Sequence, residues 1–335
     1  MSQSIIGMPV LVIGGAGYLG SAITSILLAQ GAKVTVYDNL LYQDYYQQQG
    51  VSFIYGDVRD RGLLHQTLPH FGVVIWLAAI IGDGACALYP EEAKAINYEA
   101  VSFLARNFEG RIIFPSTCSV YGRSENDNLL NEYTPFNPLS LYAETKVWAE
   151  TALANCADCI IFRLGTLYGT SPAQARPRFD LVANTFAAAA ITRGTINVYG
   201  GDQWRPMLSV NDAARTIVGE ITGNGRGVYN LVGTNLVITE LASIVASICG
   251  GEITYSSEMA DRRSYAVTGL RAQIDLNFRP LETVEAGVTA MRNLIISGRI
   301  PNPWHPRFNN QQFLKANSDR VAWPITPEGE KGWKG

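Results

Sequence analysis

The sequence predicts an α/β fold in which a doubly wound parallel sheet carries a smaller, mixed α/β lobe. Short apolar runs of strand length alternate with helical patterns over residues 10–164, and this alternation implies parallel strands with helices on both faces of the sheet. The pattern changes after Gly169, where a loop with prolines and arginines leads into shorter helices and strands. We therefore expect a first unit, a second unit and a tail, with the bounds 1–170 (joined again by 205–235), 171–204 with 236–300, and 301–335.

Each predicted strand of the large sheet is a short run rich in Val, Ile, Leu or aromatic residues and bounded by turn residues. These runs are 10–13, 34–37, 51–55, 73–77, 111–115 and 160–164. Helical periodicity of the apolar residues predicts helices between them, at 18–30, 60–68, 90–107 and 142–155. In the second half, the same criteria predict helices at 179–193, 211–222, 239–249 and 281–297, and strands at 197–199, 228–232 and 252–255. Ligands of such sheets bind at the carboxyl ends of the strands, so the residues that follow each strand are candidates for a site.

A glycine-rich turn follows the first predicted strand and begins the first helix. Gly14 allows the tight turn, Gly17 lets the backbone approach a pyrophosphate, and Gly20 lets the helix pack closely on its strand. The pyrophosphate would lie at the N-terminus of this helix, where free N–H groups and the helix dipole favour an anion. Asp38 ends the second strand, where a carboxylate binds the adenosine ribose hydroxyls and repels a 2′-phosphate. The pattern therefore predicts a Rossmann-type site for NAD rather than NADP; the alternative is a glycine-rich turn in another kind of α/β protein.

Two further segments follow strand ends and extend the predicted cofactor site. Asp57 comes just after the third strand, where it could reach the adenine amine or cap the following helix, and the two roles are compatible. Ala78 and Ala79 follow the fourth strand, and their small side chains let the backbone lie close to a ribose or a nicotinamide.

A tyrosine and a lysine begin the helix predicted at 142–155. Tyr142 and Lys146, at positions i and i+4, lie on one face of this helix. A nearby ammonium favours the phenolate and lowers the pKa of a tyrosine from about 10, which makes Tyr142 a general base near neutral pH. Thr117 follows the fifth strand, so its hydroxyl also faces the strand ends. The alternative for the Tyr–Lys pair is an ordinary contact at the surface.

The composition restricts the classes of function. The chain is 47% hydrophobic and 16% charged, which allows a large core, and a net charge of −3 does not indicate a nucleic-acid-binding surface. We expect neither a signal peptide nor a membrane span, because no apolar stretch approaches the roughly 20 residues that a span needs. Five irregularly spaced cysteines suit a reducing cytoplasm, and three scattered histidines do not predict a metal site.

Taken together, the motifs resemble those of the extended short-chain dehydrogenases/reductases, and specifically of the nucleotide-sugar epimerase/dehydratase family. The resemblance extends to about Gly298. It depends on the order and spacing of Gly14-x-x-Gly17-x-x-Gly20, Tyr37-Asp38-Asn39, Gly56-Asp57-Val58, Leu77-Ala78-Ala79, Ser116-Thr117-x-Ser119-Val120-Tyr121-Gly122, Tyr142-x-x-x-Lys146 and Arg163-Leu164-x-x-Leu167-Tyr168-Gly169.

The resemblance implies roles for these residues. NAD would contact the glycine turn with Tyr18 and Leu19, then Asp38, Asn39, Asp57, Val58, Leu77, Ala78, Ala79, Tyr142 and Lys146. Tyr142 would remove a proton from a sugar hydroxyl while hydride passes from that carbon to the nicotinamide. Lys146 would lower the pKa of the tyrosine and hold the nicotinamide ribose, and Thr117 would hydrogen-bond the reacting oxygen.

The resemblance also implies that the second unit holds a nucleotide-diphosphate sugar, whose charge requires arginines. Residues 203–212 resemble a family segment that contacts the diphosphate through Arg205. Residues 261–267 resemble a second segment of that kind, which points to Arg263. The alternative for each arginine is a salt bridge at the surface.

Other residues of the second unit extend this prediction. Arg176 and Arg178 could add to the diphosphate pocket or form surface salt bridges. Asn184 lies near where the family places an asparagine against the phosphate or the sugar, and Asn97 of the first unit is expected to brace the site.

Three positions bear on the reaction. The family's 4,6-dehydratases have Asp and Glu after the catalytic Thr, as acid and base for water loss, whereas this chain has Cys118 and Ser119. Hexose 4,6-dehydration is therefore disfavoured, and both residues are expected to shape the sugar pocket. The loop with Ile81 is expected near the nicotinamide and the sugar, and Asp83 in that loop is a second proton donor or, as we favour, a turn residue.

The favoured function is a C4 epimerase of a nucleotide sugar, which forms a 4-keto intermediate and returns hydride to the other face. A dehydrogenase, reductase, decarboxylase or dehydratase would perform part of the same cycle. A non-catalytic NAD-binding protein is disfavoured, because it needs no acid–base residues. The family resemblance further implies a homodimer formed through the helices at 90–107 and 142–155.

Overall fold

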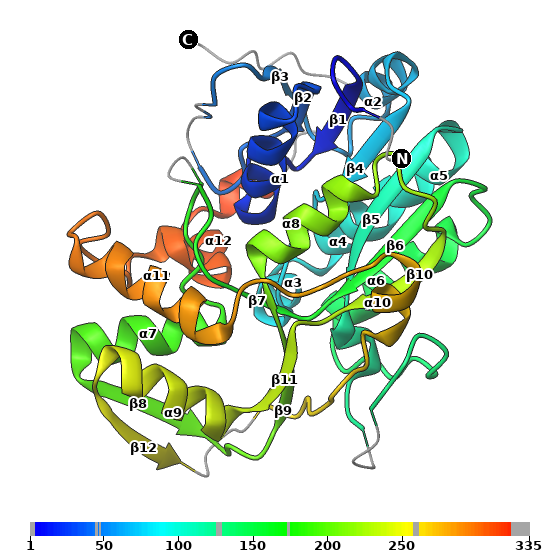
Figure 1. Cartoon of the computed structure of the whole chain (residues 1–335). Coiled ribbons are helices and arrows are strands. Elements are labelled where there is room, and N and C mark those ends of the chain that lie inside the picture. The colour runs from blue at the N-terminus through cyan, green and yellow to red at the C-terminus, as the bar shows by residue number, and fades with distance from the viewer. Residues whose placement is uncertain are drawn as a thin grey trace.

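The computed structural model describes residues 4–43, 46, 48–124, 129–172, 175–256 and 261–322. Its main feature is a parallel sheet with the strand order β10-β6-β5-β4-β1-β2-β3. The strands are β1 Pro9–Ile13, β2 Lys33–Asp38, β3 Ser52–Tyr55, β4 Val73–Trp76, β5 Arg111–Thr117, β6 Cys159–Leu164 and β10 Gly227–Leu231. The predicted doubly wound α/β class is therefore confirmed, and Figure 1 shows the sheet with helices on both sides.

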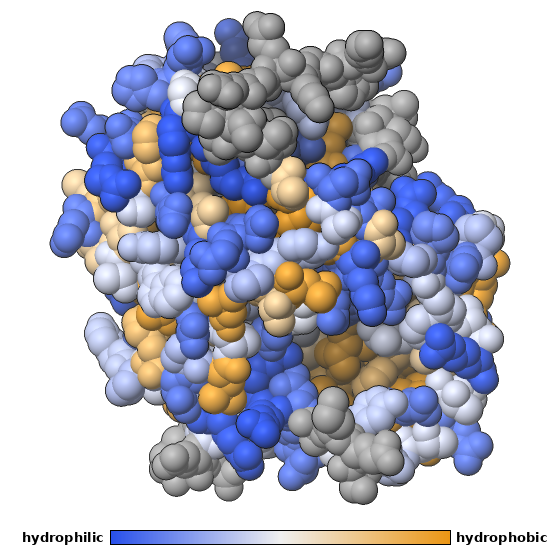
Figure 2. Space-filling view, turned by 180° about the vertical axis from the view of Figure 1, so that it is seen from behind, coloured by the Kyte–Doolittle hydropathy of each residue, from blue (hydrophilic) through white to orange (hydrophobic). Residues whose placement is uncertain are grey.

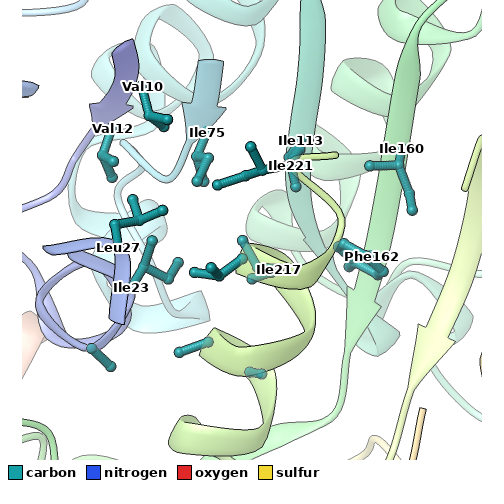
Figure 3. Packing of buried hydrophobic residues seen from close by; sticks show 14 of the residues in the cluster. Val10, Val12, Ile23, Leu27, Ile75, Ile113, Ile160, Phe162, Ile217 and Ile221 are labelled. Carbon is teal, nitrogen blue, oxygen red and sulfur yellow. The ribbon is translucent and has the colours of Figure 1, made fainter. Parts of the chain in front are cut away.

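Side chains alternate between the two faces of this sheet. In β1, Val10 and Val12 face one core, whereas Leu11 and Ile13 face the other, and all four are fully buried. Helices α1 Tyr18–Ala29 and α8 Val210–Gly219 cover the first face. Figure 3 shows Ile23 and Leu27 of α1 beside Ile217 of α8, under Val12 and Ile75 of the sheet. Phe162 of β6 lies on the other side of Ile217.

The second face is covered by helices that come before β6 in the chain. They are α2 Arg61–Thr67, α4 Pro90–Lys94, α5 Ala100–Asn107 and α6 Leu141–Leu153. The single helix predicted at 90–107 runs through α4 and α5 with a π-helical turn at Ala95–Glu99 between them. Such turns are frequent at functional sites, and this one contains the buried Asn97.

The second lobe forms a separate core below the sheet (Figure 1). It contains α7 Val182–Arg193, β8 Thr195–Tyr199, α9 Ile238–Cys249, β12 Glu252–Ser256 and α11 Val284–Ile296, with β8 and β12 paired in parallel. Between the lobes lies a small sheet of β7 Thr166–Tyr168, β9 Trp204–Ser209 and β11 Thr234–Val237. The chain leaves this lobe to form α8 and β10 and then returns to it. This path supports the proposed division into two interleaved units.

The remaining elements are short. They are α3 Asp83–Leu88, α10 Leu270–Asp275 and α12 Asn310–Ala316, with single helical turns at Leu68–His70, Cys118–Tyr121, Pro306–Phe308 and Ser318–Arg320. The tail therefore contains an ordered arm, since Phe313 and Leu314 of α12 are buried in the core that holds Trp76. Trp323 and Trp333 of the predicted tail lie outside the described residues.

The surface seen from behind is largely hydrophilic, and its hydrophobic residues form small groups and the floor of a hollow (Figure 2). Within the described ranges, every helix is too short or too polar to cross a lipid bilayer.

Candidate active site

A cavity of about 930 Å³ runs along the carboxyl ends of β1, β2, β4, β5 and β6 and continues into the second lobe. This is the edge of the sheet where the sequence predicts a ligand. The cavity has the size typical of ligand sites and takes its wall from both lobes and from the C-terminal arm. Its two ends differ in how they are built.

The glycine turn forms one end of the cavity. Gly14 has φ +82°, and a Cβ there would lie 2.5 Å from the backbone nitrogen of Ala78. A Cβ on Gly20 would lie 2.6 Å from the carbonyl oxygen of Gly14. Gly17 differs, because the nearest atom to a Cβ there is 3.4 Å away, and this residue is the N-cap of α1 without a side-chain cap. Free space beside uncapped helix N–H groups fits the pyrophosphate of a dinucleotide.

Asp38 stands at the end of β2 beside this turn. Its carboxylate accepts hydrogen bonds from the backbone nitrogens of Ala16 (3.0 Å) and Leu40 (2.8 Å). Burial raises the pKa of the Asp38 carboxyl to about 6, against the effect of these two hydrogen bonds. Asp38 and Asn39 both line the cavity, as do Tyr18, Leu19 and Val58.

Asp57 does not line the cavity, in contrast to the expected contact with adenine. Its side chain is fully buried and forms a bidentate ion pair with Arg59 (2.8 Å for each bond) and accepts a hydrogen bond from Asn39 at 2.7 Å. It is not the helix cap either, because Asp60 caps α2 through the backbone nitrogen of Leu63. The carboxylate thus orders the loop that carries Asn39.

The segment after β4 forms the floor of the cavity, with Leu77, Ala78, Ala79 and Ile81 in its lining. The buried Asn97 holds this segment on both sides: its Oδ1 accepts from the nitrogen of Ile80 (2.8 Å), and its Nδ2 donates to the oxygen of Ile80 (2.9 Å). Asn97 also donates to Thr145 of α6 at 3.2 Å. It therefore braces the floor against the helix that carries Tyr142.

Thr117, Tyr142 and Lys146 come together in this cavity. Thr117 ends β5, and Tyr142 lies in the first turn of α6, which Ser140 caps. Thr117 lies close enough to Tyr142 to lower the pKa of its hydroxyl, and Lys146 follows one helical turn later.

The electrostatics of Tyr142 differ from the expectation. Burial raises the pKa of Tyr142 well above its usual value, Cys86 and Asp83 add to this effect, and Arg178 and Thr117 oppose it. The Lys146 ammonium instead donates to the carbonyl oxygen of Pro115 (3.1 Å) and lies 4.5 Å from the ring centre of Phe114. Burial also lowers the pKa of Lys146 to about 8, although Glu150 opposes this change. In this structure the pKa of Tyr142 is therefore raised, in contrast to the lowered pKa expected beside Lys146.

The two residues that follow Thr117 point in different directions. Cys118 does not shape the cavity, contrary to expectation: it is 1% exposed, and its thiol donates to the carbonyl oxygen of Arg163 at 3.2 Å. The chain enters a 3₁₀ turn here, so successive side chains diverge. Ser119 lines the cavity, and its hydroxyl is 3.1 Å from that of Tyr265.

The arginines at the other end of the cavity are mostly paired with carboxylates. Arg205 and Arg263 share Asp261, at 2.8 and 2.5 Å, and Arg263 also contacts Asp83 at 3.3 Å. Asp83 begins α3 and accepts a hydrogen bond from Ser140 at 2.7 Å, so it joins the two lobes and is more than a turn residue.

Arg178 and Arg176 also line the cavity. Arg178 is paired with Asp180 at 2.5 Å, whereas Arg176 has no ion pair within the described part of the chain. Asn184, predicted to touch the substrate, does not line the cavity. Its amide accepts from the nitrogen of Gly169 (3.1 Å) and donates to the oxygen of Arg178 (2.9 Å), so it fixes the entrance to α7.

Several residues of the cavity wall were not predicted from the sequence. Asp180 lies two residues after Arg178, and this spacing was a usable signal. No local sequence signal marks Tyr42, Trp304 or Asn310, because their position depends on how the tail packs against the first unit.

A doubly wound parallel sheet with a glycine turn, an acid after its second strand and a Thr–Tyr–Lys group at its carboxyl edge defines the class of short-chain dehydrogenases/reductases of the extended type. The chain belongs to the NAD dependent epimerase/dehydratase family, whose model matches residues 10–231.

Individual relatives are distant. A dTDP-glucose 4,6-dehydratase of Streptomyces niveus is 28% identical over 318 residues, which cover 83% of this chain and 92% of that protein. A putative UDP-arabinose 4-epimerase of Arabidopsis thaliana is 29% identical over 184 residues, which span 49% of this chain and only 42% of that protein. Among solved structures, MoeE5 in complex with UDP-glucose and NAD is 26% identical, with a TM-score of 0.74, and the match covers 88% of this chain and all of that one.

Proposed function

We propose that the protein is an NAD-dependent epimerase of a nucleotide-diphosphate sugar, which acts on the C4 hydroxyl through a 4-keto intermediate. The observation that carries the proposal is the grouping of Thr117, Tyr142 and Lys146 in one cavity with the glycine turn. A binding protein would need the turn but not this acid–base group.

The chain's own groups supply proton transfer and orientation. Tyr142 takes the proton of the sugar hydroxyl and later returns it, and Thr117 holds the reacting oxygen through its hydroxyl. Bound NAD supplies the carbon that accepts hydride and gives it back. Because burial raises the pKa of Tyr142, its ionised form depends on nearby positive charge, which Arg178 supplies in this structure.

The cofactor residues of the proposal lie at the glycine-turn end. In the proposal, the pyrophosphate lies beside Gly17 at the start of α1, and Asp38 accepts from the adenosine ribose; both residues line the cavity. Ala78 and Ala79 lie against the nicotinamide half, and Lys146 donates to its ribose; these residues line the cavity as well. Asp57, whose carboxylate is paired with Arg59, is not one of the proposed contacts.

The substrate residues of the proposal lie at the arginine end. Arg205 and Arg263 are the candidates for the diphosphate, and Ser119 and Ile81, which both line the cavity, for the sugar. MoeE5 was solved with UDP-glucose, and this supports a nucleotide-diphosphate sugar as the substrate class.

An epimerase is favoured over a 4,6-dehydratase because no carboxylate stands after Thr117: Cys118 is buried away from the cavity, and Ser119 is a poor acid or base at neutral pH. A C4 dehydrogenase, reductase or decarboxylase fits the same residues and is the second candidate.

Incubation with a panel of UDP-, dTDP- and GDP-sugars, followed by NMR of the products, tests the proposal. An epimerase converts one sugar into its C4 epimer without net change in NADH absorbance. Accumulation of NADH, release of carbon dioxide or loss of water would instead identify a dehydrogenase, a decarboxylase or a dehydratase. Tyr142→Phe is the control, since it keeps the cavity and removes the acid–base hydroxyl.

We also propose that the protein forms a homodimer through α5 and α6. Trp148 of α6 is 36% exposed and contacts Tyr98 edge-on at 5.7 Å, beside a surface depression lined by both helices. Trp148→Glu should convert the dimer to a monomer in sedimentation experiments; a sedimentation coefficient that does not change would contradict this interface. The proposed location is the cytoplasm, in line with five free cysteines, Cys156 and Cys159 among them.

A further inference from the structure

Arg176 differs from the other buried arginines of the cavity. It is 8% exposed, and no carboxylate of the described residues lies within ion-pair distance of its guanidinium. Its partners are neutral: Nη1 donates to the carbonyl oxygen of Arg307 (2.6 Å) and Nη2 to Oδ1 of Asn310 (2.5 Å). Burial and the neighbouring Arg178 lower the pKa of Arg176 to about 10, while the charge of Asp180 opposes this change. A buried cation without a carboxylate in direct contact is costly, so we look for a role other than stability.

The arm after the second lobe holds this arginine in place. Asn310 is 2% exposed and is tied to both lobes: Nδ2 donates to the oxygen of Ile81 (3.2 Å), and its backbone nitrogen donates to Asp180 (2.9 Å). Pro303, Trp304 and residues 309–312 of the arm line the cavity. The arm lies beyond residues 10–231, which the family model matches, so it is a feature of this chain that the family motifs do not include.

The loop after β2 lies directly against Arg176. The guanidinium is 4.6 Å from the ring centre of Tyr42, and the other neighbour of this ring is Phe313 of the arm, at 5.6 Å. The hydroxyl of Tyr42 is buried and has no hydrogen-bond partner within the described residues. The same loop contacts the glycine turn, because Gln43 donates to the oxygen of Ala16 (3.3 Å) and Asp38 accepts from the nitrogen of Ala16.

We propose that Arg176, held by Asn310 and Tyr42, binds the pyrophosphate of NAD, and that the C-terminal arm thereby retains the cofactor. This assigns to the cofactor an arginine that the sequence had assigned to the substrate. Two of the five N–H donors of the guanidinium are used by the arm, and within the described residues no hydrogen bond is recorded for the others, which are the donors proposed for the ligand. The unpaired Tyr42 hydroxyl is a further donor beside them. Arg205 and Arg263, which share Asp261, remain the candidates for the substrate diphosphate.

The inference rests on the proposed placement of NAD in the cavity but not on the reaction, so binding alone tests it. The protein is freed of nucleotide, and the dissociation constants of NAD, ADP, adenosine and UDP are measured by calorimetry. Arg176→Gln removes the charge. Asn310→Asp puts a carboxylate oxygen where the amide oxygen now lies, 2.5 Å from Nη2 of Arg176. Arg176 then becomes paired with a carboxylate, as Arg178 already is. Asn302→Asp is the matched control, because Asn302 belongs to the same arm, is exposed, and needs only an oxygen to accept from the nitrogen of Trp304.

Arg176→Gln and Asn310→Asp should each weaken the affinity for NAD and ADP roughly tenfold or more. They should leave the affinity for adenosine and UDP within about twofold of that of the original protein. They should also lose NAD during purification, whereas Asn302→Asp should retain it. Weaker binding of UDP with unchanged ADP would overturn the inference and return Arg176 to the substrate, and unchanged constants for all four ligands would overturn it as well. An original protein that binds neither NAD nor ADP would overturn the cofactor placement itself. If the original protein binds NAD but shows no epimerase activity, only the proposed reaction would be contradicted.

Discussion

The two ends of the cavity are built by different means. At the cofactor end, the shape comes from the backbone. A Cβ on Gly14 or Gly20 would lie less than 3 Å from neighbouring backbone atoms, whereas a Cβ on Gly17, at the N-terminus of α1, would not. At the substrate end, the shape comes from long side chains in a network, in which Asp261 joins Arg205 to Arg263.

This difference shows why the first end is general and the second is specific. A backbone turn offers N–H groups that any pyrophosphate can use, and it needs no partner from elsewhere in the chain. The arginine network depends on the second lobe and on the relative position of its loops, so small changes there alter which ligand fits. The following experiments test this contrast, beginning with the residue that lies between the two ends.

Tyr142→Phe should have the largest effect. The ring stays in place, so NAD should bind as before, but turnover should fall roughly 10²- to 10⁴-fold because the acid–base hydroxyl is gone. Initial rates and NAD affinity are measured on the same preparation. If NAD binding falls together with the rate, the separation between binding and chemistry that we describe is wrong.

Gly14→Ala and Gly17→Ala should separate folding from cofactor binding at the backbone end. Gly14 has φ +82°, so an alanine costs about 1–3 kcal/mol from this conformation alone, apart from its clash with Ala78. Gly17 has room for a Cβ, so its variant should melt near the original temperature yet bind NAD about tenfold more weakly. Thermal unfolding with and without NAD measures both effects, and tight NAD binding by Gly17→Ala would contradict the placement of the pyrophosphate.

Asp38 predicts a pH dependence of cofactor binding. The pKa of its carboxyl is raised to about 6 in the folded protein, so the ionised form, which accepts best from ribose hydroxyls, is lost as the pH falls through 6. NAD affinity should therefore decrease below about pH 6. The unfolded chain takes up this proton only near pH 3.8, so between these values the folded state binds more protons and gains stability from this group as the pH falls. Asp38→Asn should remove both dependences.

Asp261→Asn should have the smallest effect, and the effect should be a gain. The substitution removes the carboxylate that neutralises Arg205 and Arg263, so UDP should bind roughly two- to fivefold more tightly. Asp275→Asn is the control, because Asp275 pairs with Arg271 at 3.5 Å outside the cavity lining. A weaker affinity for UDP in Asp261→Asn would show that the carboxylate orients the arginines rather than competing with the ligand.

The parts of the site that the sequence predicted depend on local rules. The strand–glycine–helix pattern fixes the turn at Gly14, and the strand-end rule brings Thr117 and Tyr142 to one edge of the sheet. Two predictions failed because they assumed a side-chain direction: Cys118 and Asn184 lie in the expected segments but turn away from the cavity.

Other features could not be predicted because they depend on distant contacts. Burial raises the pKa of Tyr142, and the Lys146 ammonium donates to Pro115; the i, i+4 spacing contains neither fact. Asn310 reaches Ile81 across more than two hundred positions of sequence, and no motif marks this contact. The strands β7 and β11 are three and four residues long, too short to give a periodic signal.

The position of α8 against α1 has a consequence for engineering (Figure 3). The helix belongs to the second half of the chain, yet it shields Ile75 and Phe162 of the first half from water. A fragment that stops near residue 170 would expose this surface, so it should aggregate rather than form an autonomous nucleotide-binding module. Chimaeras with relatives therefore need crossover points that exchange α8 and β10 together with the N-terminal half.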